Sequence, residues 1–199
     1  MKDHLDCRSV RGLSRPFYVP AGQSPEAAAT GPFCSNLVMY DWATIVAQLL
    51  RNNPDGKPHH ISAMLLEFEN NGGAEVDPPS YTRADAATYY DSLGTHPDRD
   101  ILRVPLTASS LESTDRNFFP GGNLINFFAQ TEGVVGRHGK EFSSAEQSRV
   151  FGAALISTPD FDDPTQDLVF SRIYYSDPDQ QLIKTAGSQI GLQWRLQFE

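Results

Sequence analysis

The C-terminal segment IGLQWRLQFE constrains the fold more than any other stretch of the chain. From Ile190 to Phe198 every second residue is apolar, and glycine or a polar residue stands at each position between. A period of two places the apolar side chains on one face of a β-strand and the polar side chains on the other. Trp194 shares the apolar face with Leu192 and Leu196, so we expect it in the core and not on a sugar-stacking platform. The segment predicts a strand that packs one face against a core.

A second segment, HHISAMLLEFE, is apolar on both faces at its centre, which is typical of a strand that is covered on both sides. Further short strands are predicted along the second half of the chain, at 100–110, 123–133, 149–157, 166–176 and 180–184. Turn-forming Pro and Asp residues separate several of them, and no strand–helix–strand alternation supports a parallel sheet. The expected fold is therefore mainly β, an antiparallel β-sandwich of jelly-roll or immunoglobulin-like type.

Two helices are predicted before these strands. The first covers residues 35–52, with Ser35 as N-cap and an apolar stripe at spacings of three and four. That stripe consists of Val38, Trp42, Ile45, Val46, Leu49 and Leu50. A shorter helix is expected within 81–93, capped by Thr82. The helix at 35–52 is expected to pack on the sandwich.

Residues 1–34 are expected to form an extended arm, because prolines recur between Gly and Ala without any helical or strand period. Two alternatives stay open: a disordered terminus, or an arm laid over a neighbouring subunit with Phe17, Tyr18 and Phe33 as anchors. The predicted organisation is thus an arm over 1–34 and a single β-sandwich domain over 35–199. The length of 199 residues fits one sizeable core with such an attachment.

Charge and targeting signals limit the classes of partner. Sixteen Lys and Arg residues against 25 Asp and Glu give a net charge of −9, without a basic cluster, so nucleic acid and anionic membranes are not expected partners. The N-terminus lacks the apolar region of a signal peptide, and no apolar run is long enough to span a bilayer. We expect a soluble protein that folds in the cytosol, with Cys7 and Cys34 as reduced thiols; a disulfide between them is the alternative that stays open.

Chemistry-bearing residues are scattered and form no catalytic motif. Asp160, Asp162, Asp163 and Asp167 lie close enough in sequence to suggest calcium, but the loop lacks the central Gly and final Glu of a helix–loop–helix site. An acidic hairpin loop is the preferred interpretation. Adjacent His59 and His60 point to opposite faces of a strand start and are not expected to share a metal. No cofactor and no enzyme activity are predicted.

A glycine-rich loop around 133–141 carries Arg137 and His138, which we interpret as interface residues. A hydrolase that uses His138 or Asp162 is the weakest of the functional alternatives, because no nucleophile motif accompanies them.

One family resemblance covers residues 36–199. The segments NLVMYDWATIVAQLL and ISAMLLEFENNG resemble the opening of a family of tailed-bacteriophage structural domains. The family's closing features resemble Phe151–Leu155, Phe170–Arg172, Lys184 and Gln193–Arg195. The sequence departs from the family pattern where Glu67 and Glu69 replace glycines, and where Arg149 or Val150 replaces a glutamate.

The resemblance implies a β-sandwich used as a virion part in the neck, collar or baseplate, or as the mounting for tail fibres. It implies no catalytic residues, folding in the host bacterial cytoplasm and a place in the virion. Expected partners are other copies of the chain in a ring or trimer, and portal, tail or fibre proteins, met through the arm and the loops 107–122 and 133–148. The sequence ends with the strand that would close the sandwich, which favours an adaptor over a fibre. The alternative is a carbohydrate- or receptor-binding module.

Overall fold

The structure is a computed structural model. It describes residues 10–35, 37–38, 44–45, 47, 59–70, 90–91, 97–113, 123–131, 135–143, 145, 147–175, 177–186 and 188–198. The strands are β1 (Val10–Pro20), β2 (Cys34–Ser35), β3 (Leu37–Val38), β4 (His60–Glu69), β5 (Arg99–Ser113), β6 (Asn123–Gln130), β7 (Arg149–Thr158), β8 (Leu168–Tyr174), β9 (Leu182–Ile183) and β10 (Ser188–Phe198). The helices are α1 (Pro25–Ala28) and two short 3₁₀ turns, η2 (Pro164–Gln166) and η3 (Pro178–Gln180).

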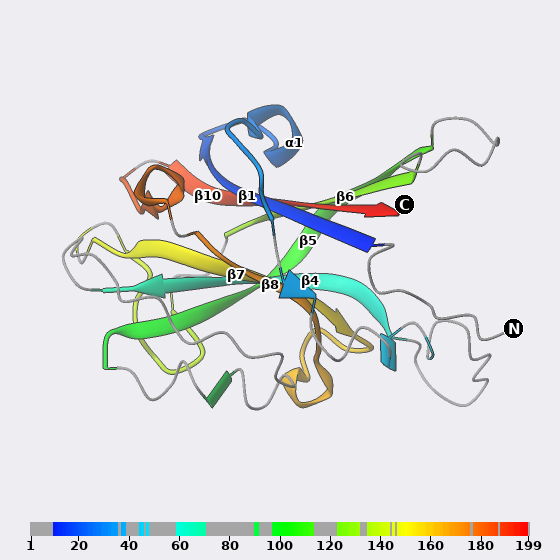
Figure 1. The fold of residues 1–199 in the computed structure, drawn as a ribbon. Coiled ribbons are helices and arrows are strands. Elements are labelled where there is room, and N and C mark those ends of the chain that lie inside the picture. The colour runs from blue at the N-terminus through cyan, green and yellow to red at the C-terminus, as the bar shows by residue number, and fades with distance from the viewer. Residues whose placement is uncertain are drawn as a thin grey trace, which may run out of the picture.

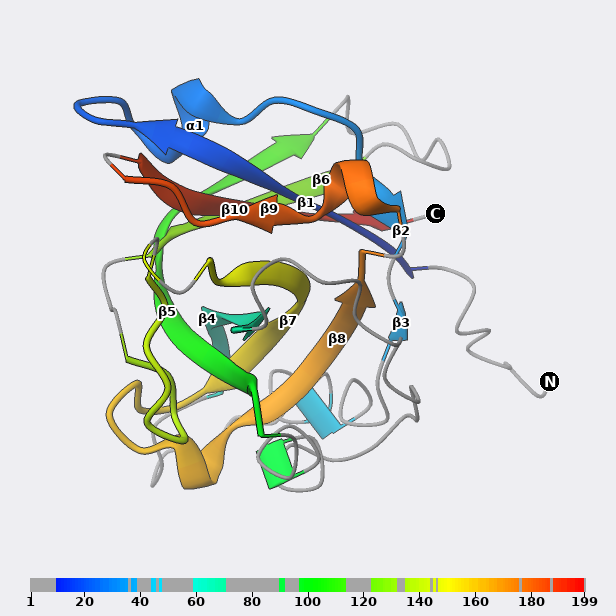
Figure 2. The ribbon, with the colours of Figure 1, turned by 90° about the vertical axis from the view of Figure 1, so that its left-hand side faces the viewer.

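The described strands form one antiparallel sheet in the order β2-β1-β10-β6-β5-β4-β7-β8-β3, with β9 beside β7. The sheet folds into two layers, an upper one with β1, β10 and β6 beneath α1, and a lower one with β4, β7 and β8 (Figures 1 and 2). Strand β5 belongs to both layers, since Arg99–Pro105 pairs with β4 and Leu106–Ser113 pairs with β6 across a register shift. The mainly antiparallel two-layer fold is confirmed.

A short segment after α1 joins the two ends of this sheet. Ser35 and Cys34 of β2 pair with Leu13 and Ser14 of β1, and Leu37 and Val38 of β3 pair with Arg172 and Ser171 of β8. Because β2 and β3 follow each other in the chain, residues 34–38 bring the first and last strands of the path together. Near-closure of this kind protects backbone groups that open sheet edges would expose.

The predicted helix over 35–52 is wrong at its start, because Ser35 is a strand residue and not an N-cap, and Leu37 and Val38 form β3. Of its later positions, Thr44, Ile45 and Ala47 are helical and Ile45 is fully buried. The predicted helix within 81–93 is described only at Tyr90 and Asp91, which are helical, and Thr82 lies outside the described residues.

Residues 10–34 belong to the sheet and its cover, not to an arm. Strand β1 pairs with β10 along its whole length, from Val10 opposite Phe198 to Pro20 opposite Ser188. Proline is tolerated because β2 covers β1 only at two positions, so Pro16 lies where β1 has one neighbouring strand. The predicted boundary after residue 34 therefore falls inside β2, while residues 1–9 lie outside the described part of the chain.

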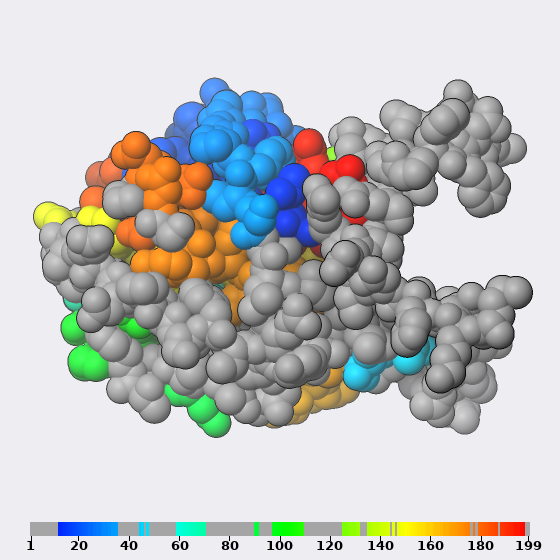
Figure 3. Space-filling model, viewed as in Figure 1, coloured from blue at the N-terminus to red at the C-terminus, as the bar shows by residue number. Residues whose placement is uncertain are grey.

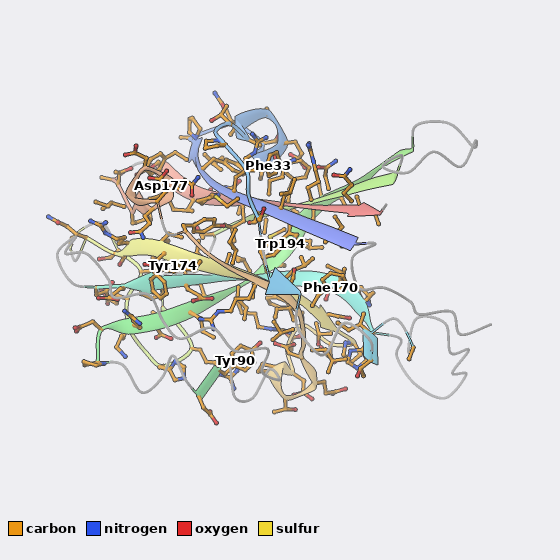
Figure 4. The ribbon with its side chains drawn as sticks, in the orientation of Figure 1. Phe33, Tyr90, Phe170, Tyr174, Asp177 and Trp194 are labelled. Atoms are coloured by element: carbon orange, nitrogen blue, oxygen red, sulfur yellow. The ribbon has the colours of Figure 1, made fainter. Side chains whose placement is uncertain are left out.

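The main core fills the space between the layers. Trp194 is fully buried there with Leu192 and Leu196, as the alternation of β10 predicts (Figure 4). Strand β4 contributes Met64 to this core, while Leu65 on its other face packs with a second cluster. The second cluster contains Ala63, Leu65, Tyr90, Ile101, Phe151, Ala154, Ile156 and Val169. Strand β4 is thus covered on both faces, as predicted.

Candidate functional site

A hollow of about 350 Å³ opens on the outer side of the lower layer, where two loops meet. Val135 and Arg137 come from the loop before β7, and Phe161 and Asp162 come from the acidic loop before β8. Tyr90 and Arg103 are also among its lining residues, and Figure 4 shows Tyr90 below the lower layer. We call this site the lower hollow. The lower hollow brings together residues from segments that are far apart in the sequence.

An ion pair fixes one wall of the lower hollow. The Arg103 guanidinium donates from Nε and Nη2 to the two carboxylate oxygens of Asp167, at 2.9 and 2.7 Å. The Asp167 side chain is fully buried, and it also accepts a hydrogen bond from the Tyr90 hydroxyl. Burial, followed by the negative charge of Asp167, raises the pKa of Tyr90 well above its ordinary value. The Tyr90 hydroxyl therefore stays protonated, and the opposite charges of Arg103 and Asp167 cancel each other.

Two guanidinium groups cover aromatic rings at this site. Arg103 lies 4.3 Å from the centre of the Phe161 ring, and Arg137 lies 4.4 Å from the centre of the Tyr90 ring. Arg137 is exposed, and among the described residues no carboxylate lies within ion-pair distance of it. In the described part of the chain, the lower hollow therefore combines an arginine that forms no ion pair with apolar surface.

Asp100 holds the loop that carries Arg137. Its buried carboxylate accepts backbone N–H bonds from Ile101 at 2.8 Å, from His138 at 2.9 Å and from Lys140 at 2.9 Å. A side chain at Gly136 would collide with this carboxylate, so glycine is required there. Asp100 thus acts as a positioning residue for Val135 and Arg137.

The same carboxylate lies 2.9 Å from Nδ1 of His138. A carboxylate at this ring nitrogen fixes the tautomer and orientation of an imidazole, as it does for general bases. The His138 side chain is 26% exposed. Among the described residues, no nucleophilic side chain contacts its other nitrogen, and the three backbone bonds give Asp100 a structural role in the loop.

The four aspartates considered for calcium have separate roles. Asp167 forms an ion pair with Arg103. Asp163 accepts hydrogen bonds from Thr165 and Gln166, and these bonds lower the pKa of its carboxyl group. Asp160 accepts from the backbone N–H of Asp162. In the part of the chain that the structure describes, no group of three or more His, Cys, Asp or Glu side chains is arranged to hold a metal ion. The four residues do not form one site.

The predicted aromatic anchors also differ from expectation. Phe17 is only 3% exposed, and it packs with Val19 and Ala28 beneath α1, so its prediction as an interface anchor is wrong. Tyr18 is 39% exposed and donates its hydroxyl to the carbonyl oxygen of Ile183 at 2.8 Å. Phe33 is half-buried, and two arginines of its own chain lie against its ring.

Cys34 is half-buried and packs against the main core, where burial and then the charge of Asp177 raise the pKa of its thiol. Cys7 lies outside the described residues, so the prediction of two reduced thiols stays a prediction.

Sequence reasoning missed the buried charges on the outer face of the lower layer. The Arg172 guanidinium donates to both oxygens of Glu67, at 2.8 and 2.9 Å, and the two side chains are 4% and 0% exposed. Arg99 forms a similar pair with Glu69 at 2.6 Å. The available signal was the presence of two glutamates inside an apolar interior strand, since buried carboxylates require cationic partners.

Comparison with protein-family models, with curated proteins and with solved structures gives no match for this chain. Fold and site geometry therefore define the class, a mainly antiparallel β protein with one nearly closed sheet and a loop-built hollow on its lower layer. A search of the described residues for a helix of sufficient length and apolar character to cross a membrane finds none.

Proposed function

We propose that the protein is a non-enzymatic structural component of a phage virion, placed in the neck, collar or tail region. It associates with copies of itself and docks tail or fibre proteins. The sequence resemblance over residues 36–199 supports the virion assignment. The lower hollow supports docking as the mode of action.

The observation that carries the docking function is the clustering of exposed apolar residues. Val135 is 55% exposed and Phe161 is 37% exposed, and both line the hollow that also contains Arg137. Apolar side chains beside an unneutralised arginine are the composition expected of a binding hot spot. The volume of about 350 Å³ accommodates an anchoring side chain, around which a larger interface of roughly 800 Å² per partner would form.

The ion pairs between strands of the lower layer suit the same function. Buried ion pairs link β4 to β5 through Glu69 and Arg99, and β4 to β8 through Glu67 and Arg172. Such pairs hold strands in one register, and a docking surface on a rigid layer loses little conformational entropy on binding.

The test is co-expression with the products of the genes that flank the coding sequence, followed by affinity purification and size-exclusion chromatography with light scattering. We expect a stable complex with a portal, tail or fibre protein. Arg137→Glu and Val135→Asp should each weaken it by about thirtyfold in Kd, as loss of a hot-spot residue does. Gln189→Glu, an exposed change on β10 in the upper layer, is the matched control and should leave the complex intact.

Absence of any complex with the neighbouring gene products contradicts the proposed function. A complex that is insensitive to both hollow variants contradicts the docking site alone. A glycan array tests the carbohydrate-binding alternative, which the site does not favour because a guanidinium lies over each of the rings of Tyr90 and Phe161.

A further inference from the structure

The outer face of the upper layer carries a cationic patch that we call the Phe33 patch, made of Arg15, Phe33 and Arg195. Arg15 belongs to β1 and Arg195 to the adjacent β10. Their guanidinium groups lie 4.4 and 4.6 Å from the centre of the Phe33 ring. Figure 4 shows Phe33 beside α1 at the top of the molecule. Figure 3 shows the light-blue segment that follows α1 at the surface.

Neutral groups satisfy the hydrogen bonds of the Phe33 patch but do not cancel its charge. Arg15 donates to the Gln193 side chain at 2.8 Å and to the carbonyl oxygens of Gly31 and Ala29 at 2.8 and 3.1 Å. Arg195 donates through Nε to the side-chain oxygen of Asn126 at 3.0 Å. Among the described residues, neither guanidinium has a carboxylate within ion-pair distance.

The two cations of the patch repel each other. Burial, and after it the charge of Arg195, lowers the pKa of Arg15 from its ordinary value. An acidic group bound at the patch would relieve this repulsion. In a chain with nine more acidic than basic residues, the patch is unusual because two partly exposed arginines lie side by side with no carboxylate partner among the described residues.

A complementary surface lies on the opposite side of the same chain. The loop 160–163, which forms one wall of the lower hollow, carries exposed Phe161 and Asp162 and half-exposed Asp163. No cation lies within ion-pair distance of Asp162 or Asp163 among the described residues. The loop leads into η2 at the bottom of the molecule, whereas α1 lies at the top, and both views agree on this (Figures 1 and 2).

We propose that the Phe33 patch binds the acidic loop 160–163 of a second copy of this chain, so that copies associate head to tail. Asp162 and Asp163 face Arg195 and Arg15, and Phe161 adds apolar contact. The inference rests on the proposed function, because it names the contact through which copies of the chain associate. The two surfaces differ, so every copy keeps one free patch and one free loop, which builds a ring when the rotation closes and a filament when it does not.

The experiment measures association by sedimentation velocity over a concentration series, at about 0.05 M and 0.5 M salt. We expect wild-type protein to associate at low salt and less at high salt. Arg195→Glu and Asp162→Arg should each weaken association by at least about tenfold, since each places like charges across the contact. Gln189→Arg, which adds a charge at an exposed position of β10 six residues away from Arg195, is the control and should associate as wild type.

Mixing the two variants gives the decisive result. In an equimolar mixture, R195E and D162R meet through opposite charges at both kinds of contact between unlike chains, so association should return. Circular dichroism and urea unfolding of each variant verify that the fold is intact. A wild type that stays monomeric at both salt concentrations, single variants that associate normally, or a mixture that fails to associate would each overturn the inference.

The outcome is separable from that of the proposed function. A monomeric wild type that still co-purifies with portal, tail or fibre proteins rejects head-to-tail association alone. A monomeric wild type without any such partner rejects both.

Discussion

Replacement of Arg172 by methionine is expected to destabilise the protein strongly. The two hydrogen bonds from Arg172 to Glu67 are 2.8 and 2.9 Å long, and neither side chain is more than 4% exposed. Methionine has an apolar chain of similar length and removes the guanidinium. The Glu67 carboxylate then stays buried and loses the charge and the two hydrogen bonds of Arg172, which is costly in a medium of low dielectric constant.

The magnitude follows from the burial of the pair. Removal of one partner of a buried ion pair costs about 3–5 kcal/mol, a large part of the roughly 5–15 kcal/mol by which domains are stable. Replacement of both partners, Glu67→Leu with Arg172→Met, removes both charges of this pair and is expected to fall within about 1 kcal/mol of wild type. The double-mutant cycle should therefore be strongly non-additive, with the double variant more stable than Arg172→Met alone.

Urea unfolding followed by circular dichroism gives the free energy of each variant at the four corners of the cycle. Arg137→Met is the matched control, because this arginine is exposed and its loss should cost less than about 1 kcal/mol. A loss below about 1 kcal/mol for Arg172→Met, or strictly additive effects of the two changes, would refute the physical reasoning about this pair.

Two further predictions concern close packing and the thiol. Gly152→Ala should destabilise by about 1–3 kcal/mol, because the new Cβ would lie 2.8 Å from the carbonyl oxygen of Ile173 and 2.9 Å from the Glu67 carboxyl carbon; unchanged urea unfolding would contradict this. Burial raises the pKa of Cys34, so in a Cys7→Ser background its alkylation by iodoacetamide should reach half-maximal rate at a higher pH than alkylation of a free thiol. The pKa of Cys34 is higher in the folded protein than in the unfolded chain. The stability that this difference contributes is therefore fully present below the unfolded pKa and declines as pH rises through the folded pKa. A half-maximal alkylation rate at or below the pH found for a free thiol would contradict the assignment.

The pattern of apolar residues was sufficient to identify the strands whose faces are buried as that pattern predicts. Strand β10 has one fully buried face, and its other face is exposed or half-buried at Gln189, Arg195 and Gln197, so alternation identified the strand and the burial of Trp194. Strand β4 is covered on both faces, and a continuous apolar run identified it. The acidic loop before β8 was also predictable, because Asp and Pro favour turns wherever they occur.

Strand β1 could not be identified in this way. Ser14 and Pro16 face the main core opposite Trp194 and Leu192, while its apolar Phe17 and Val19 face outward beneath α1. Gly191 leaves space for the Phe17 ring on that outer side. The apolar face of this strand therefore points away from the main core. Alternation within a strand does not predict which part of the protein will cover each of its faces.

The sequence alone was sufficient to predict an antiparallel sheet from composition, charge and the period of the apolar residues. Each of these properties depends on neighbouring residues or on an average over the chain, and not on contacts between distant residues. Tertiary structure alone decided which distant residues meet. Tyr90 and Asp167 are 77 positions apart, and Glu67 and Arg172 are 105 apart, yet each pair is in contact. Such contacts depend on strand order and register, which arise from the packing of the whole chain, so the lower hollow, the Phe33 patch and the buried ion pairs appear only once the sheet has folded.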